Sequence, residues 1–503
     1  MPAAAAMPDA QVCERARLSR DARFDGLFFT AVRTTGIYCR PVCPAPAPKP
    51  GNVRYYPSAA AAEAAGFRPC LRCRPELAPG EGSWRRGDEA VARALKLIDQ
   101  GALAEGSLAA LAARLHLGER QLRRLFVVRL GAAPNAVHTT RRLLFAKQLL
   151  TETALPVTTV AMEAGFGSLR RFNAAFRQAY GLAPRDLRRQ LPAVQDGPLV
   201  LRLGYRPPYD FDAVLAFFRG RALPGVERVD ARTYARAFGH DGGTGWLRVG
   251  RWPAPAHALR LEVHGAATGG LLGIVQRVRR MFDLDADPHA IASVLGRDPR
   301  LAPLLRAHPG LRIPSGWDGF EIAVRAVIGQ QVSVAAARTL TARLAAAHGA
   351  ALPAPLAAQG FGHLFPSVEA LSEADPDGFG LTRARAQAVR GIARAVREGR
   401  VDFAADAPLD DFVARWTALP GIGPWTAQYI ALRALGHPDA FPAEDLILQR
   451  TVPADGTRLG ARALSARAEA WRPWRGYAVI ALWHEAMAAA PAPSHPAASR
   501  SAA

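Results

Sequence analysis

Four cysteines stand in two pairs near the start of the 503-residue chain, at a spacing that can bind a metal. The stretch TGIYCRPVCP holds Cys39 and Cys43, and FRPCLRCRP holds Cys70 and Cys73, which gives the pattern C-x3-C-x26-C-x2-C. Two short cysteine loops that meet supply the tetrahedral set of thiolates that zinc prefers. In a reducing compartment, paired cysteines favour a metal over disulfides. The pattern therefore predicts one zinc site, and spacing alone favours a zinc that only holds the fold.

The residues around these cysteines resemble a known module. The run from Phe28 to Glu76, with the landmarks AVRTTGIYCRP and AAGFRPCLRCRP, is similar to the zinc-bearing N-terminal module of the Ada methylation-response family. The resemblance implies that Cys39 is a sacrificial nucleophile that takes a methyl group from a methylphosphotriester in DNA, while Cys43, Cys70 and Cys73 hold the zinc. Zinc keeps such a thiolate deprotonated, and methylation lowers the negative charge of the site from about −2 to about −1, which weakens repulsion from DNA phosphates.

The fifth cysteine, Cys13, lies outside this pattern. It is expected to be an ordinary free thiol. No cysteine follows Cys73, so an iron-sulfur cluster held by cysteines in the C-terminal part of the chain is not expected.

A carboxylate that could stabilise positive charge follows a glycine turn in the last third of the chain. The run LPGIGPWTAQYIALR contains Gly421 and Gly423, and its LPGIG is typical of a helix-hairpin-helix turn whose backbone approaches a phosphate. Asp445, in HPDAFPAEDLILQR, comes 22 residues after Gly423. The family that this combination resembles, named in the next paragraph, implies that Asp445 is a carboxylate that stabilises the positive charge developing on the sugar as the bond between sugar and base is cleaved. The neighbouring acid Glu444 is the alternative at this position.

Together these residues resemble the AlkA-type alkylation-repair DNA glycosylases of the helix-hairpin-helix superfamily, from RPPYDFDAVLAFFRGRAL to WRPWRGYAVIALW. The resemblance implies a monofunctional enzyme, because related strand-cutting enzymes carry a lysine where this chain has Trp425. It implies a base-flipping pocket lined by Trp425, Tyr429, Trp483 and Phe217, suited to cationic N-alkylated purines such as 3-methyladenine. Gln331, in IGQQVSV, stands where the family often has an apolar wedge. The alternative for each aromatic residue is a place in the core.

Two helix-turn-helix patterns lie between about Gly87 and Arg189. The first breaks at Leu117-Gly118 and the second turns at Gly165-Phe166-Gly167. The segment resembles the AraC-type DNA-binding domain, most specifically in GFGSLRRFNAAFRQAYGLAPRDLR. The resemblance implies two recognition helices, at about 119–127 and 168–176, that enter successive major grooves. Their candidate DNA contacts are Arg120, Gln121, Arg123, Ser168, Arg170 and Arg171.

Composition and length fit a multidomain DNA-binding protein. The net charge of +21 attracts a polyanion, and most of the excess lies in the first two fifths of the chain. A chain of 503 residues is too long to fold around a single hydrophobic core, so several domains are expected. The expected fold is a multidomain α+β chain: a zinc methyl-acceptor domain (1–82), an all-α double helix-turn-helix domain (85–190), a linker (191–198), an α/β subdomain (199–312), an all-α helix-hairpin-helix glycosylase domain (313–490) and a disordered tail (491–503).

The overall hypothesis is a bacterial DNA-alkylation response protein. Its expected partners are damaged and promoter duplex DNA and RNA polymerase. Because no signal peptide or membrane span is evident, we expect a cytoplasmic, nucleoid-associated monomer. The main alternative is a transcription regulator whose glycosylase-like half only binds DNA and whose zinc is purely structural.

Overall fold

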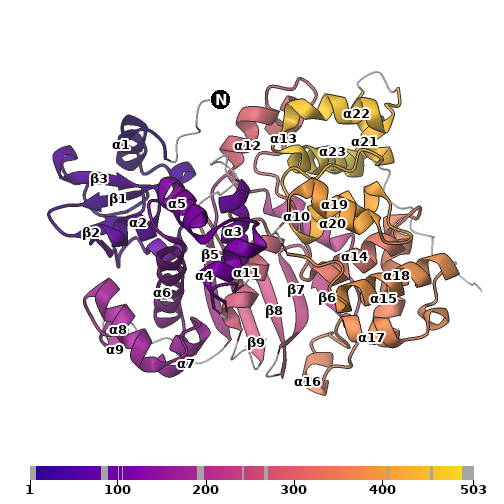
Figure 1. The fold of residues 1–503 in the computed structure, drawn as a ribbon, viewed down its shortest axis with the longest axis horizontal. Helices are drawn as coiled ribbons and strands as arrows, with labels where there is room; N and C mark the ends of the chain where they lie inside the picture. Colours follow the sequence, from indigo (N-terminus) through magenta and orange to yellow (C-terminus); the bar gives the residue numbers. More distant parts are fainter. Residues whose placement is uncertain are drawn as a thin grey trace, which may run out of the picture.

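The computed structural model describes residues 7–80, 89–99, 101–104, 106–189, 198–240, 243–265, 270–404, 407–453 and 457–489. The expected tail over 491–503 lies outside these residues, as does the expected linker apart from Pro198. In the described segments, no helix has both the length and the apolar character needed to cross a bilayer. The parts follow one another across the molecule, from the cysteine-bearing module at the left of Figure 1 to a helical part at the right.

The N-terminal module is a small sheet with the strand order β3-β1-β2-β4. Its elements are α1 (Ala10–Leu18), β1 (Phe29–Val32), β2 (Ile37–Cys39), β3 (Val53–Tyr56), α2 (Ala59–Ala64) and β4 (Arg68–Pro69). Strands β2 and β4 run parallel, with Ile37 opposite Arg68 and Tyr38 opposite Pro69. Because each of these two strands leads directly into a cysteine loop, their pairing brings the two loops together.

The next part is all helical and contains two copies of one motif. Its helices are α3 (Glu89–Asp99), α4 (Leu108–Arg114), α5 (Glu119–Leu130), α6 (Pro134–Glu152), α7 (Val157–Glu163), α8 (Leu169–Tyr180) and α9 (Pro184–Arg189). The expected recognition helices are α5 and α8. Both end at a glycine with φ of +71°, Gly131 and Gly181, and a proline begins the helix that follows each one. Glycine adopts this left-handed backbone without strain, so it stops both helices at the same point of the motif.

A five-stranded antiparallel sheet with the order β5-β9-β8-β7-β6 forms the centre of the molecule. Its elements are β5 (Leu199–Gly204), α10 (Phe211–Arg219), β6 (Glu227–Val229), β7 (Thr233–His240), β8 (Gly243–Arg251), β9 (Ala258–Gly265) and α11 (Leu271–Met281). The strand expected at 257–265 is β9. Leu203, Leu247 and Leu261 point from one face of the sheet into the core, where α11 packs on them.

The C-terminal part is helical, as expected from Ile313 onward. The helices after α11 are α12 (Pro288–Leu295), α13 (Ala302–Ala307), α14 (Gly319–Ile328), α15 (Val334–His348), α16 (Ala354–Ala357), α17 (Val368–Glu373), α18 (Arg383–Arg397), α19 (Leu409–Thr417), α20 (Pro424–Ala434), α21 (Leu446–Thr451), α22 (Ala461–Ala468) and α23 (Arg475–Ala489). Trp416 and Trp471 are almost fully buried among them. Burial of such a side chain stabilises the fold by about 2–3 kcal/mol.

Buried polar contacts join the N-terminal module to the parts that follow. Lys147 of α6 is 1% exposed; its Nζ donates to the carbonyl of Cys70 at 3.1 Å and lies 2.6 Å from Glu76 Oε2. The fully buried Arg206, just after β5, donates to the carbonyls of Asp25 and Asp285, both at 2.8 Å. Removal of one partner from such a site leaves a buried charge or carbonyl unpaired, which costs several kcal/mol. The cysteine module therefore packs directly on both of its neighbours.

Candidate active sites

The four expected zinc ligands converge in the structure. One Sγ atom from each of Cys39, Cys43, Cys70 and Cys73 lies within 4.8 Å of the other three. Cys70 and Cys73 are buried, whereas Cys39 and Cys43 are partly exposed. The group consists of four thiols and contains no other type of ligand. Four such soft ligands fit a tetrahedral Zn²⁺ site. Both cysteines of the first loop reach the surface, so exposure alone does not distinguish Cys39 from Cys43 as a nucleophile.

Without a metal, hydrogen bonds among the four thiols shift their pKa values in opposite directions. Hydrogen bonding from Cys39 lowers the pKa of Cys70, and hydrogen bonding with Cys43 raises the pKa of Cys39. A divalent cation removes this competition because it favours the thiolate form of all four. Cys13 is different: burial raises the pKa of its thiol to about 12, and its Sγ donates to the carbonyl of Pro8 at 3.3 Å. Its environment is that of an inert thiol.

The side chain of Arg40 holds the second cysteine loop through a backbone carbonyl of that loop. The Nη1 of Arg40 donates to the carbonyl of Cys73 at 3.1 Å, and its Nε donates to Asp25 at 2.9 Å. The backbone N–H of Arg40 points at the Cys73 sulfur, 3.4 Å away. An N–H aimed at a thiolate stabilises its negative charge. Arg74, also close in sequence, pairs instead with Glu76 and Glu152.

The carboxylate of Asp445 lies in a buried pocket of N–H donors. Its Oδ1 accepts from the backbone amides of Ile447 and Leu448 at 3.0 and 3.1 Å, because Asp445 caps α21. The indole Nε1 of Trp425 donates to Oδ2 at 2.9 Å, and that of Trp483 to Oδ1 at 3.3 Å. Asp445 is only 7% exposed, whereas Glu444 is exposed to solvent. Of the two adjacent acids, Asp445 alone lies among the aromatic residues.

The aromatic residues expected around the base are brought together from three helices. The rings of Trp425 and Tyr429, one turn apart on α20, stack with centroids 5.1 Å apart. Trp483 of α23 lies 6.0 Å from Tyr429. Phe217 of α10 is joined to this group through Arg433, whose guanidinium lies 4.4 Å from the Phe217 ring and 5.7 Å from the Tyr429 ring. Phe217 and Trp483 are buried, whereas Trp425 and Tyr429 are partly exposed. These four residues are called the aromatic wall below.

The hairpin between α19 and α20 contains the two glycines that are expected to approach a phosphate. Gly421 has a φ of +82°, and a side chain there would approach Ala388 Cβ within 2.9 Å, so this position requires glycine. Gly423 is the N-cap of α20 and is open: an added Cβ would meet nothing within 4 Å. The free amides at the start of α20 can therefore approach a phosphate.

Gln331 lies beside this hairpin at the exposed turn between α14 and α15. Its φ is +54°, a left-handed backbone that is strained for a residue with a Cβ. Its neighbour Gln330 donates to the carbonyl of Gly421 at 3.0 Å and to the Thr426 hydroxyl at 2.9 Å. Gln330 thus ties the turn to the hairpin, a role that the sequence pattern did not reveal.

Comparison with known proteins matches four consecutive segments of the chain. The metal binding domain of Ada matches residues 12–76, a helix-turn-helix domain 111–190, and the AlkA N-terminal domain 200–318. The HhH-GPD superfamily base excision DNA repair protein matches residues 324–475. A Mycobacterium tuberculosis protein named "Probable bifunctional transcriptional activator/DNA repair enzyme AlkA" is 41% identical over 481 residues, 94% of this chain and 96% of that protein. The chain belongs to this bifunctional AlkA family.

Two relatives from Escherichia coli divide the bifunctional AlkA chain between them. DNA-3-methyladenine glycosylase 2 is 33% identical over 56% of this chain and 96% of its own length. The bifunctional transcriptional activator/DNA repair enzyme Ada is 36% identical over 34% of this chain, but over only 47% of its own length. This AlkA family chain is thus similar to nearly the whole of the glycosylase but to less than half of Ada.

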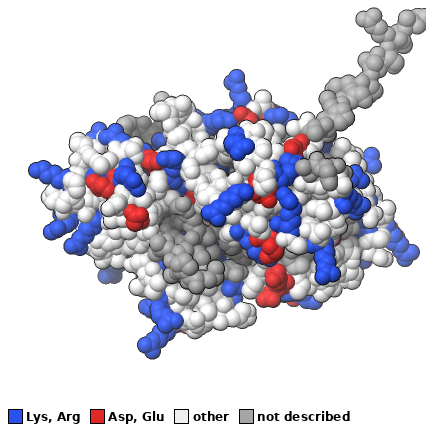
Figure 2. Space-filling view, turned by 90° about the horizontal axis from the view of Figure 1, so that it is seen from above, with Lys and Arg blue, Asp and Glu red and all other residues white. Residues whose placement is uncertain are grey.

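The expected recognition helices of this AlkA family member, α5 and α8, carry most of the candidate contact residues on exposed positions. Arg120, Gln121 and Arg123 on α5 are exposed, and Arg123 pairs with Glu119 at 2.7 Å. On α8, Arg170 and Arg171 are exposed, whereas the Ser168 hydroxyl accepts from the Arg171 amide and so caps the helix. Lys and Arg side chains are spread over the face seen in Figure 2, with fewer Asp and Glu among them. This charge distribution suits a nucleic-acid surface.

Sequence reasoning missed the arginines beside the aromatic wall. Arg221 and Arg433 both lie over the Phe217 ring, at 3.7 and 4.4 Å from its centroid. The Arg433 Nη1 donates to the Tyr429 hydroxyl at 3.0 Å. Arg433 lies four residues after Tyr429 on the same helix, a spacing that could have placed it on the aromatic face.

Proposed function

We propose that this chain is a monofunctional DNA glycosylase that hydrolyses the bond between deoxyribose and N-alkylated purines of the 3-methyladenine class in duplex DNA. The observation that carries the proposal is the carboxylate of Asp445, buried beside three aromatic rings and held by four N–H donors. Because these donors fix the carboxylate, it can stabilise the positive charge that develops on the sugar, and the carboxylate does not have to move during the reaction. Trp425 occupies the position at which related strand-cutting enzymes carry a lysine, and its indole cannot supply the amine that strand cutting needs.

In this proposal the hairpin at Gly421 and Gly423 holds the DNA, and Gln331 enters the space that the flipped base leaves. The exposed position of Gln331 at the turn before α15 supports its role. Trp425, Tyr429, Trp483 and Phe217 line the space for the extruded base. Positive charge on an N-alkylated base makes it a good leaving group, so Asp445 can act without a dedicated general acid.

Asp445→Asn and Glu444→Gln are the matched pair that tests this activity. The two adjacent substitutions each remove one negative charge, but only Asp445 is buried among the indoles. We expect Asp445→Asn to lower the single-turnover release of 3-methyladenine from methylated duplex DNA by at least about 100-fold. Glu444→Gln should stay within about twofold of the wild type. Equal, background release by wild type and Asp445→Asn would instead support a DNA-binding regulator without enzyme activity.

We further propose that Cys39 accepts a methyl group from a DNA methylphosphotriester while bound to zinc with Cys43, Cys70 and Cys73. The sulfur attacks the methyl carbon, the carbon–oxygen bond breaks, and the phosphodiester leaves with the electron pair. The partial exposure of Cys39 supports it as the nucleophile over the buried Cys70 and Cys73; its choice over Cys43, which is also partly exposed, rests on the resemblance to the Ada module. Mass spectrometry after exposure to phosphotriester DNA tests it. Methylation of the Cys39 peptide is expected; methylation at Cys43 or an unmodified protein contradicts it.

The helices α5 and α8 are proposed to read promoter DNA, with RNA polymerase as the partner of a monomeric, cytoplasmic activator bound to the nucleoid. The exposed side chains Arg120, Gln121, Arg170 and Arg171 support DNA contact. This division assigns regulation to 85–190 and base excision to 199–490. If Arg170 contacts a phosphate, Arg170→Ala should weaken binding of all sequences and reduce the salt dependence by about one unit of slope. A change restricted to one base position would identify Arg170 as a base reader.

A further inference from the structure

A cavity of about 550 Å³ lies on the outer face of the central sheet. Its floor is formed by β8 and β9, where the exposed Arg248 and Arg260 alternate with Leu247 and Leu261, which point into the core. Its walls are the turn before β7 and the start of α10. This volume is in the range of small-molecule sites, which measure about 300–1,000 Å³. No residue of the aromatic wall lines this cavity, so the two sites are separate.

The lining of this cavity carries more positive than negative charge. Four arginines and two acids contribute to it, namely Arg232, Arg248, Arg251, Arg260, Asp212 and Glu262. Glu262 pairs with both Arg248 and Arg260. Asp212 lies 2.9 Å from Arg251. Among the residues that the structure describes, no carboxylate pairs with Arg232. The excess of two positive charges attracts an anion.

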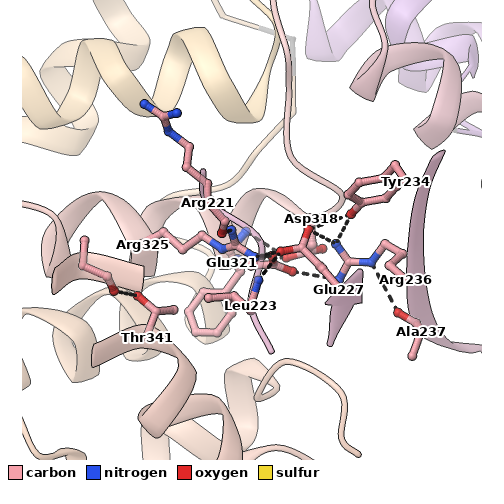
Figure 3. A network of polar contacts seen from close by, with 12 residues as sticks. Arg221, Leu223, Glu227, Tyr234, Arg236, Ala237, Asp318, Glu321, Arg325 and Thr341 are labelled. Atoms are coloured by element: carbon pink, nitrogen blue, oxygen red, sulfur yellow. Dashed lines mark hydrogen bonds and ion pairs between the residues drawn. The ribbon is translucent and has the colours of Figure 1, made fainter. Parts of the chain in front are cut away.

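Arg236, on the buried face of the same sheet, belongs instead to a balanced set of charges. Glu227 lies 2.7 Å from Arg325 and 3.7 Å from Arg236. Glu321 lies 3.0 Å from Arg236 and also contacts Arg325. Figure 3 shows these four side chains joined in one network. Two acids thus balance two arginines inside the fold, whereas the cavity on the outer face has two acids for four arginines.

Glu262 holds two arginines of the cavity in fixed positions. Its side chain is buried; its Oε2 accepts from the Nε of Arg248 at 2.8 Å, and its Oε1 accepts from the Nε of Arg260 at 2.7 Å. The Nη1 group of each arginine makes no hydrogen bond within the described residues. Both guanidinium groups therefore keep N–H donors for a ligand, in the planar arrangement that matches the oxygens of a phosphate.

Gly250 of β8 keeps the floor of the cavity open. It stands opposite Thr233 of β7 and opposite Arg260 of β9. A Cβ at this position would lie 3.3 Å from the Thr233 Cγ2, so a side chain here would fill the space beside the arginine. Glycine weakens a strand, and within a strand it often marks a place where a ligand approaches closely. A ligand can therefore reach the backbone of the sheet between Thr233 and Arg260.

From the cavity, its excess charge and its open floor, we infer that the outer face of the sheet binds a phosphate-bearing ligand. Arg232, Arg248 and Arg260 donate to the phosphate oxygens, and Gly250 lets the ligand lie against the strand. A phosphate of the DNA backbone and a free phosphate compound offer the same acceptor oxygens, so both satisfy this chemistry. The site does not rest on the proposed glycosylase, because it shares no residue with the Asp445 site.

The test measures how fast phenylglyoxal, which modifies arginine, reacts with each arginine of the full chain. Mass spectrometry of the peptides gives one rate for each arginine. The two probes are inorganic phosphate and an undamaged DNA duplex, each compared with sodium chloride at the same ionic strength. At about ten times its Kd, a bound probe should slow the reaction of Arg232 and Arg260 about 10-fold. The exposed Arg297 and Arg306, outside the cavity, are internal controls whose rates inorganic phosphate should not change.

Gly250→Val fills the floor of the cavity and leaves every charge in place. It should abolish the slowing at Arg232 and Arg260. Slowing by the duplex in the wild type that is lost in this variant assigns the ligand to the DNA backbone. Slowing by inorganic phosphate alone, lost in the same way, assigns it to a free phosphate compound. Slowing by neither probe, or equal slowing in wild type and variant, overturns the inference.

A second comparison keeps the inference testable if valine distorts β8. The cavity variant combines Arg232→Gln with Arg260→Gln. The control variant combines Arg297→Gln with Arg306→Gln and loses the same charge elsewhere. For a free ligand, the cavity variant should raise the Kd of inorganic phosphate at least about 10-fold and the control less than about twofold. For a DNA ligand, only the cavity variant should lower the slope of log K against log salt by about two, because each phosphate contact contributes about 0.9. Equal effects of the two variants would contradict a site in the cavity.

Discussion

The cysteine cluster and the Asp445 site are assembled in different ways. The four thiols come from two loops of one small module, placed side by side by the parallel pairing of β2 and β4. The second site takes Phe217 from α10, Trp425 and Tyr429 from α20, Asp445 from the start of α21 and Trp483 from α23. The first site depends on local loops and a metal, whereas the second depends on how two large parts pack. Perturbations of the metal and of the packing should therefore separate the two sites.

Loss of one zinc ligand should produce the largest effect. Cys70→Ala is expected to abolish stoichiometric zinc binding and to unfold the N-terminal module, because structural zinc contributes about 10 kcal/mol or more to folding. Zinc content and near-ultraviolet circular dichroism measure this. Excision at Asp445 should remain within about threefold, since no residue of that site contacts the cluster.

Cys13→Ala is the control for this experiment, because Cys13 is buried outside the cluster. It should keep one zinc per chain. Full zinc content in Cys70→Ala would contradict a four-cysteine zinc site. Loss of excision in that variant would show that the two sites are not separable.

The packing that builds the second site can be strengthened at Asp283. Its Oδ2 accepts from the backbone of Ile313 at 3.2 Å and from the Tyr477 hydroxyl of α23 at 2.8 Å. Burial raises the pKa of Asp283 to about 6, from an ordinary value of 3.8. Because the folded pKa is raised, the stabilising contribution is complete below about pH 4 and is lost as the pH rises through about 6. Asp283→Asn mimics the protonated acid and should stabilise the protein at pH 7–8 by up to about 3 kcal/mol.

Urea denaturation at pH 4 and pH 8 measures this difference. The gain should vanish at pH 4. The matched change is Asp285→Asn. Burial raises the pKa of Asp285, but the charge and hydrogen bond of Arg279, the Gly80 amide and the charge of Arg206 together outweigh it and lower that pKa, so this substitution should destabilise the protein at pH 8. A gain for Asp283→Asn that is equal at both pH values would mean that Asp283 does not titrate in this range.

Trp425→Phe should have the smallest effect and tests the hydrogen bond alone. The substitution removes the 2.9 Å contact from Nε1 to Asp445 Oδ2 but keeps an aromatic ring against Tyr429. We expect a loss of about 10-fold in the single-turnover excision rate, the magnitude of one hydrogen bond to a charged group. Trp246→Phe, on β8, where the indole stacks on His264, should change the rate by less than twofold. Equal rates for both variants would show that the indole contact does not position the carboxylate.

The sequence predicted most of the cysteine site and only part of the second site. The spacing of four cysteines determines a metal cluster because short loops leave few other arrangements, and the periodicity of α5 and α8 predicted both helices and their exposed faces. The aromatic set and Asp445 needed a family resemblance, since residues from 217 to 483 share no local pattern. Arg221, Gln330 and the glutamates that neutralise Arg325 and Arg236 were missed, because only tertiary packing determines which charges remain unpaired.

The most direct test of two separate chemistries in one chain uses duplex DNA that carries both 3-methyladenine and methylphosphotriesters. Free base and the mass of the Cys39 peptide are measured in the same reaction for the wild type, Asp445→Asn and Cys39→Ser. We expect Asp445→Asn to lose base release and keep methyl transfer to Cys39, and Cys39→Ser to keep base release and lose the transfer. Loss of both readouts in either variant, or of neither, would contradict it.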